Sequence, residues 1–286
     1  MDTPEVARSY LYVPGDAPEE LATALTRGAD AVVVDLEDAV PADGKETARK
    51  TVAAWLRTVP AGAQVWVRIN PGPLGHDDAR EVAGAGLRGL CVARTESSVQ
   101  LDALDAVLST VEADGGLAPR AIAVTPMLET AGAILSAPAI ARAPRVARLQ
   151  LDEADLQADL GVSLADDERE LLWARSQVVV ASAAAGLDAP VGAVPTGTVG
   201  IDRLRNSTHA LKRLGFRGRA CVTSDQLLVA NEVFTPPAAE LEAAQDIVDR
   251  YGAALRDGLP GAVDARGRPI DEAVVRAARR TLAVLV

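Results

Sequence analysis

The chain has 286 residues, 49% hydrophobic and 24% charged, which is typical of a globular protein that can bury one sizeable core. Its formal net charge of −11 argues against nucleic acid as a partner, although a local arginine or a metal ion could still hold a small anion. The first residues lack an apolar signal-peptide core, and no stretch approaches the roughly 20 apolar residues of a membrane span. We therefore expect a cytoplasmic protein without membrane or nucleic-acid partners.

Short β-branched runs alternate with longer helical patterns along most of the chain. The predicted strands are 9–14, 31–37, 64–70, 89–94, 121–129, 147–152, 190–194 and 219–223. The predicted helices are 19–27, 45–56, 77–85, 97–113, 132–142, 165–185, 202–214 and 225–233. Eight strands that are each followed by a helix favour an α/β fold, a (β/α)8 TIM barrel. An open, doubly wound parallel sheet is the structural alternative, because periodicity alone does not separate the two.

The composition changes after Phe234. Pro236 and Pro237 break the preceding helix, and residues 238–255 then read as an amphipathic helix. A turn-rich segment leads to a last helix that ends near Leu285. We interpret residues 1–235 as the barrel catalytic domain and residues 236–286 as a C-terminal helical extension or lid, since the tail is too short for a core of its own.

Polar residues stand at the ends of five successive predicted strands, where the active sites of barrels are built. They are Asp35, Glu37, Asp38, Arg68, Asn70, Arg94, Glu129, Asp152, Glu153 and Asp155. A single polar strand end is as easily explained by contact with solvent, but five in succession are not. Carboxylates with no matching lysines call for a cation, and oxygen ligands favour Mg²⁺ over Zn²⁺.

The scarcity of some residue types excludes other chemistries. The chain contains only these lysines and histidines: Lys45, Lys50, Lys212, His76 and His209. No lysine ends an apolar strand, so a Schiff-base aldolase is excluded and a metal-dependent route to an enolate is preferred. Two histidines are too few for a His-rich zinc site. The sequence also lacks the G-x-S-x-G elbow and the G-x-x-x-x-G-K-[ST] phosphate loop.

Several segments together resemble one known family over nearly the whole chain. The most specific is ADAVVVDLEDAVPADGKETAR, and the others are RSYLYVPGDAP, VRIN, PMLET, ADLQADLG, LGFRGRACVTSDQLLVANEVFTP and GRPIDEAVVRAARR. These segments are similar to the HpcH/HpaI aldolase and citrate lyase β-subunit superfamily, in its CitE-like branch. The resemblance implies a Mg²⁺-binding (β/α)8 barrel that forms a homotrimer or a hexamer. Such enzymes cleave or form a C–C bond between a 2-oxo acid and an acetyl-type thioester of coenzyme A or an acyl carrier protein.

The resemblance also implies roles for the strand-end residues. Glu129 and Asp155 would ligate Mg²⁺, and Arg68 would hold the substrate carboxylate and the developing oxyanion. Asp35, Glu37 and Asp38 would support the site and its metal-bound waters. Of all these residues, the expected catalytic set is Arg68, Asp38 and Glu37, and the expected substrate-binding set is Arg68, Arg94 and Asp35.

The chain departs from the family pattern within these segments. Arg94 stands where the family has lysine, and arginine binds an anion but does not readily exchange a proton. Asp152 replaces a glycine, Ala154 replaces a common glutamate, and Val222–Ser224 replaces an I-H-P segment. Two alternatives therefore stand beside the thioester lyase: a metal-dependent aldolase of free 2-oxo acids, and a non-catalytic CitE-like subunit.

Overall fold

Eight parallel strands form a closed barrel in the computed structural model, which describes residues 7–195, 200–259 and 261–283. The strands are β1 (Ser9–Pro14), β2 (Ala31–Asp35), β3 (Val65–Ile69), β4 (Gly89–Val92), β5 (Ala123–Leu128), β6 (Gln150–Leu151), β7 (Val191–Gly192) and β8 (Gly218–Cys221). They follow one another in chain order, and β1 pairs with β8 to close the ring. The predicted TIM barrel is therefore confirmed, and the open sheet is excluded.

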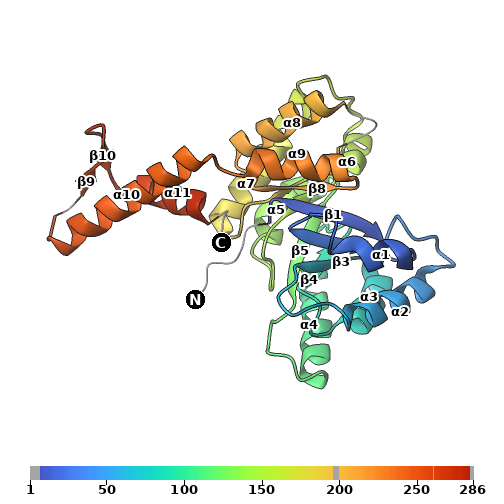
Figure 1. Ribbon diagram of the computed structural model, residues 1–286. Coiled ribbons are helices and arrows are strands. Elements are labelled where there is room, and N and C mark those ends of the chain that lie inside the picture. The colour runs from blue at the N-terminus through green and yellow to red at the C-terminus, as the bar shows by residue number, and fades with distance from the viewer. Residues whose placement is uncertain (1–6, 196–199, 260, 284–286) are drawn as a thin grey trace.

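Helices surround this barrel (Figure 1). They are α1 (Pro18–Ala24), α2 (Lys45–Leu56), α3 (Gly72–Val82), α4 (Ser98–Asp114), α5 (Ala131–Ile140), α6 (Glu153–Leu160), α7 (Leu172–Ala185), α8 (Ile201–Leu214) and α9 (Ser224–Phe234), with a 3₁₀ turn at Arg169–Leu171. The predicted helix 165–185 was wrong at its start, because α7 begins only at Leu172. The short helix α6 was not predicted, and α7 ends where expected, at Gly186 with a φ of 71°.

The barrel core has an inner and an outer layer, set by the alternation of side chains along each strand. Outward-facing aliphatic residues such as Leu11, Val34 and Val67 pack against the helices. Inward-facing residues such as Val33 and Trp66 fill the barrel. In β2 and β3 the inward row continues two residues beyond Val33 and Trp66 to Asp35 and Arg68, at the carboxyl end of the barrel.

The pairing between β6 and β7 is the shortest of any two neighbouring strands in the barrel. Only Gln150 and Val191 pair in register there, although longer strands, 147–152 and 190–194, were predicted. By contrast, β1 and β2 pair over five positions. An ion pair between Arg148 Nη2 and Asp188 Oδ2, at 2.9 Å, also links the segments that lead into β6 and β7.

The C-terminal segment projects from the barrel as an arm (Figure 1). It consists of α10 (Ala238–Arg256), β9 (Ala262–Val263), β10 (Pro269–Ile270) and α11 (Glu272–Leu282). Tyr251, Ile270 and Val275 form a small apolar cluster of its own. The β9–β10 hairpin was not predicted, and the expected end of the last helix near Leu285 lies outside the described residues. Among the described residues, no helix combines the length and the apolar character needed to cross a bilayer.

Candidate active site

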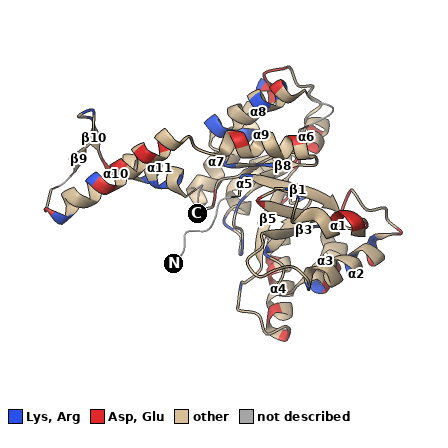
Figure 2. Ribbon diagram, in the orientation of Figure 1, with Lys and Arg blue, Asp and Glu red and all other residues tan. Residues whose placement is uncertain are grey.

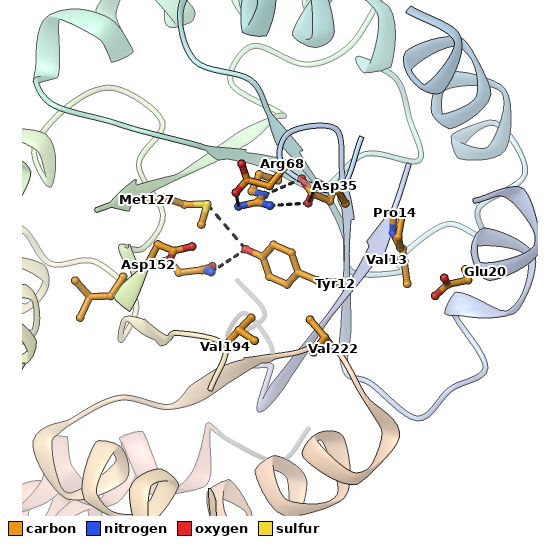
Figure 3. A pocket seen from close by; sticks show the side chains of 14 residues that line it. Tyr12, Val13, Pro14, Glu20, Asp35, Arg68, Met127, Asp152, Val194 and Val222 are labelled. Atoms are coloured by element: carbon orange, nitrogen blue, oxygen red, sulfur yellow. Dashed lines mark hydrogen bonds and ion pairs between the residues drawn. The ribbon is translucent and has the colours of Figure 1, made fainter. Parts of the chain in front are cut away.

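A cavity of about 360 Å³ lies at the carboxyl ends of the strands. Its lining includes four residues predicted from the sequence: Asp35, Asp38, Arg68 and Asp152. Figure 3 shows Arg68, Asp35, Met127 and Tyr12 from four different strands around this cavity, with Asp152 from the end of β6 beside them. Glu20 of α1 also lines the cavity, and Figure 2 shows this helix among the acidic segments of the chain.

Arg68 of β3 is held by the carboxylates of three acidic residues. Its Nε and Nη2 donate to Asp35 Oδ1 and Oδ2 at 2.7 and 2.5 Å, and its Nη1 lies 3.0 Å from Glu37 Oε2 and 3.2 Å from Asp38 Oδ2. The guanidinium carbon lies 5.6 Å from the centre of the Tyr12 ring. The arginine side chain is only 9% exposed. A planar cation held so firmly can present a fixed face to a carboxylate or an oxyanion.

Both carboxylate oxygens of Asp35 are engaged in hydrogen bonds with neighbouring groups. Besides Arg68, its oxygens accept hydrogen bonds from the backbone N–H of Glu37 at 2.8 Å and of Ala39 at 3.1 Å. The Lys45 ammonium of α2 donates to two carbonyl oxygens of the same loop. These bonds fix the β2–α2 loop and engage both oxygens of Asp35, so this residue orients Arg68.

Two buried carboxyl groups titrate far from their ordinary range. Burial raises the pKa of Glu37 to about 7, against the opposing charge of Arg68 and with a further rise from Asp38. Burial likewise raises the pKa of Glu129 to about 8, although an N–H of the backbone donates to it. Carboxyl groups with a pKa near neutrality are suited to proton transfer or to binding a cation.

Arg94 reaches the same carboxylates from β4. Its Nε lies 3.4 Å from Glu37 Oε1 and 4.0 Å from Glu129 Oε2, and its Nη2 lies 3.9 Å from Asp155 Oδ2. Its backbone N–H donates to Glu129 Oε1 at 2.9 Å, in the left-handed conformation at a φ of 51°. The two predicted metal ligands, Glu129 and Asp155, therefore lie around one guanidinium.

Not every strand-end residue joins the site. Asp152 lines the cavity and caps α6 by accepting from the Ala154 N–H at 3.0 Å, and burial raises its pKa. Glu153 instead forms a buried ion pair with Arg175, at 2.6 and 2.7 Å. Asn70 donates its side-chain amide to Asp78 and to the Leu36 carbonyl, away from the cavity.

The cavity residues that were not predicted include Tyr12, Met127 and Gln150. The Gln150 amide donates to the Tyr12 hydroxyl at 2.7 Å, and that hydroxyl lies 4.0 Å from the Met127 sulfur (Figure 3). Met127 and Gln150 each precede a strand-end acid, Glu129 or Asp152, by two positions. The two-residue period of a strand was therefore the signal that could have found them.

The donor set fits a hard divalent cation. Within the described ranges, no group of three or more His, Cys, Asp or Glu side chains converges as a complete cation cage. Glu129 and Asp155 would supply two carboxylate ligands, and Mg²⁺ is commonly held by one or two carboxylates together with waters and substrate oxygens. Glu129 is 3% exposed and its pKa is raised, so a cation beside it would favour its charged form.

A closed barrel with charged residues at the carboxyl ends of its strands is a common scaffold for enzymes. The chain belongs to the HpcH/HpaI aldolase/citrate lyase family, whose family model matches residues 8–224.

Two curated relatives and one solved structure are similar over most of the chain. A citrate lyase subunit beta of Leuconostoc mesenteroides is 29% identical and covers 99% of this chain and 94% of its own. A (3S)-malyl-CoA thioesterase of Cereibacter sphaeroides is 30% identical over 96% of this chain and 93% of its own. The structure of a citrate lyase beta subunit from M. tuberculosis, complexed with oxaloacetate and magnesium, has a TM-score of 0.69 at 26% identity. It covers 82% of this chain and 100% of that chain.

Proposed function

We propose that the protein is a Mg²⁺-dependent carbon–carbon lyase or condensing enzyme. Its substrate is a β-hydroxyacyl thioester of coenzyme A or an acyl carrier protein, and its products are an acetyl-type thioester and a 2-oxo acid. The observation that carries this proposal is a pair of cations at the site. Arg68 is buried and fixed by Asp35, and Arg94 lies within 4.0 Å of the acidic pair Glu129 and Asp155. The names of the relatives, which include a malyl-CoA thioesterase and a magnesium and oxaloacetate complex, support the same substrate class.

Each residue has a role that its environment suits. Glu129 and Asp155 hold Mg²⁺, which supplies Lewis-acid polarisation of the oxo-acid oxygens. Arg68 binds the substrate carboxylate through its fixed N–H groups and stabilises the charge that develops on the neighbouring oxygen. Arg94 offers a second, more exposed cation to an anionic group of the substrate.

Glu37 is the proposed proton carrier, with Asp38 at its side. In the cleavage direction, Glu37 accepts the proton of the β-hydroxyl group while the C–C bond breaks. The electron pair of that bond passes to the thioester enolate, which takes up a proton to give the acetyl-type thioester. A pKa of about 7 lets Glu37 exchange this proton at neutral pH.

An aldolase of free 2-oxo acids is the second candidate, and one feature of the cavity favours it. Glu20 and Asp152 add negative charge to the lining, and that charge would repel the phosphates of a thioester carrier. Turnover of a free hydroxy-oxo acid without binding of coenzyme A esters would distinguish this activity.

We also propose that residues 236–286 serve as a lid for a neighbouring subunit in a homotrimer or hexamer. The arm buries its own apolar cluster and projects from the barrel (Figure 1), so it can reach beyond its own chain. The barrel, residues 1–235, would then supply the catalytic residues.

Calorimetric titration tests the proposed function first. Mg²⁺ is titrated with and without pyruvate, glyoxylate or oxaloacetate, for the wild type and Glu129→Ala, and a panel of β-hydroxyacyl thioesters is then assayed. We expect an oxo acid to bind only in the presence of Mg²⁺. The Glu129→Ala variant should bind neither Mg²⁺ nor the oxo acid. The matched control is Glu81→Ala, which removes an exposed carboxylate from α3. A wild type that binds neither ligand, or that turns over no thioester in the panel, would contradict the proposal.

A further inference from the structure

Arg94 is a cation shared by three carboxylates of the site. Its guanidinium lies within 4.0 Å of Glu37, Glu129 and Asp155 at once. Two of these are the proposed metal ligands. The Arg94 guanidinium is therefore the cation nearest to both proposed metal ligands.

A magnesium ion on Glu129 and Asp155 would need the same space. Mg²⁺ binds its oxygen ligands at about 2.1 Å in a near-octahedral shell, so both carboxylates and several waters must close around it. A guanidinium within 4.0 Å of both carboxylates competes with the ion for their charge and repels it at short range. We propose that Arg94 and Mg²⁺ are alternative cations for Glu129 and Asp155, so that metal binding displaces the arginine side chain and arginine lowers the Mg²⁺ affinity.

The way Arg94 is held allows this exchange. Its side chain is 56% exposed, and its contacts with the carboxylates, at 3.4 to 4.0 Å, are longer than charged hydrogen bonds. Only its backbone is fixed, by the N–H that donates to Glu129. Arg94 also lines a second cavity, of about 270 Å³, between the amino ends of α3 and α4. The displaced side chain therefore has open space beside it.

Arg68 provides the contrast within the same site. Its side chain is 9% exposed and donates to Asp35 at 2.5 and 2.7 Å. Displacing it would leave a buried carboxylate without its partner, which is costly. Of the two arginines, Arg94 is thus the one that a metal ion can move.

The test is calorimetric titration of Mg²⁺ without substrate. This inference rests on the proposed function, because it takes Glu129 and Asp155 as the metal ligands. We expect Arg94→Gln to bind Mg²⁺ about tenfold more tightly than the wild type, which corresponds to about 1.4 kcal/mol. Arg94→Gly should behave alike, since glycine adopts the positive φ without strain. Arg94→Lys keeps the charge and should stay near the wild type.

The matched control is Arg88→Gln, which removes an exposed arginine just before β4, at the opposite end of that strand. Its Mg²⁺ affinity should equal that of the wild type. Unchanged or weaker binding in both neutral Arg94 variants, with a wild type that binds and a Glu129→Ala that does not, would overturn the inference alone. A wild type and Arg94 variants that all fail to bind Mg²⁺ would overturn the proposed metal site together with it.

Discussion

At the scale of single residues, charge in this protein is held in two ways. Arg68 is locked by short hydrogen bonds to Asp35, while Arg94 is half exposed and touches its carboxylates loosely. A locked cation is preorganised for an oxyanion, because it pays no reorganisation cost when charge develops. A loosely held cation such as Arg94 can be displaced by another ion. Substitution of Arg68 should therefore change turnover, and substitution of Arg94 should change the affinity for Mg²⁺.

Replacing Arg68 by lysine should lower kcat/KM by about 100-fold, the effect typical of losing one oxyanion donor. Lysine keeps the charge but lacks the planar fork, so it cannot satisfy both oxygens of Asp35. Steady-state kinetics on the best thioester, with a thermal melt to verify folding, measure the effect. Arg88→Lys serves as the control. Activity within threefold of the wild type would show that the fork is dispensable.

Glu112 makes a second prediction at this scale, concerning stability and pH. Burial alone would raise its pKa, but hydrogen bonds from Arg145 and from the backbone N–H of Ile122 and Arg120 hold the pKa below its ordinary value. A carboxylate with a lowered pKa stabilises the fold above its unfolded pKa of about 4.3 and loses that contribution as the pH falls through the folded pKa. Glu112→Gln should thus cost about 3 kcal/mol at neutral pH, the cost typical of breaking a buried pair.

Urea unfolding at pH 7 and near pH 3 checks this sign. The difference between Glu112→Gln and the wild type should shrink at the lower pH, because the unfolded wild-type chain then binds a proton at Glu112 and the advantage of the paired carboxylate declines. The exposed Glu242→Gln is the control and should change stability little at either pH. A difference that stays the same at both values would contradict the assigned ion pair.

At the scale of elements, α3 shows how closely a helix can approach a strand end. A Cβ at Gly75 would lie 1.8 Å from the carbonyl oxygen of Asn70, which is sterically impossible without a backbone shift. The sequence pattern predicted a start for this helix only at residue 77. The structure begins it at Gly72, with Pro73 in its first turn.

Gly75→Ala should therefore destabilise the protein by at least about 1–3 kcal/mol, the usual cost of overpacking. The matched control is Gly84→Ala, because nothing lies within 4 Å of a Cβ built there and its φ is not positive. Chemical unfolding of both variants measures the contrast. Equal stability would mean that α3 moves away from β3 without cost.

Most helices and strands of the barrel could be predicted from the sequence, but the shortest elements could not. The alternation of strand and helix predicted the barrel, and Pro236 and Pro237 predicted the break before α10. Helix α6 and the β9–β10 hairpin were missed, because such short elements depend on tertiary pairing. In the site, strand-end positions predicted one acidic rim with two arginines, and Glu37 lies within ion-pair distance of both Arg68 and Arg94. No local pattern could reveal that Glu153 turns to Arg175, since that partner is 22 positions away.

At the scale of the whole molecule, the barrel and the arm bury their apolar residues separately. The barrel closes through β1 and β8, while the arm packs around Tyr251, Ile270 and Val275. The apolar cluster of the arm contains no side chain of the barrel core, and the barrel core contains none of the arm. The barrel should accordingly fold without the arm.

Deleting residues 236–286 tests this independence. We expect the shortened protein to melt within about 4 °C of the full chain, the shift that 1 kcal/mol produces in a domain of this size. The site of the shortened protein should lose the cover that a neighbouring subunit's arm provides, so the KM for the thioester should rise in steady-state kinetics. An unfolded product would refute the independence of the barrel, and an unchanged KM would refute the role of the arm as a lid.

The short pairing between β6 and β7 makes this side of the barrel the easiest to open. Only Gln150 and Val191 pair in register there, and the Arg148–Asp188 ion pair supplements the backbone bonds between the two segments. Because the Arg148 side chain is only 8% exposed, dissolved ions screen this pair weakly. Local opening should therefore begin with the backbone between β6 and β7. Gln150, which donates to Tyr12 in the cavity, lies in β6, so solvent deuterium should reach the backbone amides of the site first from this side.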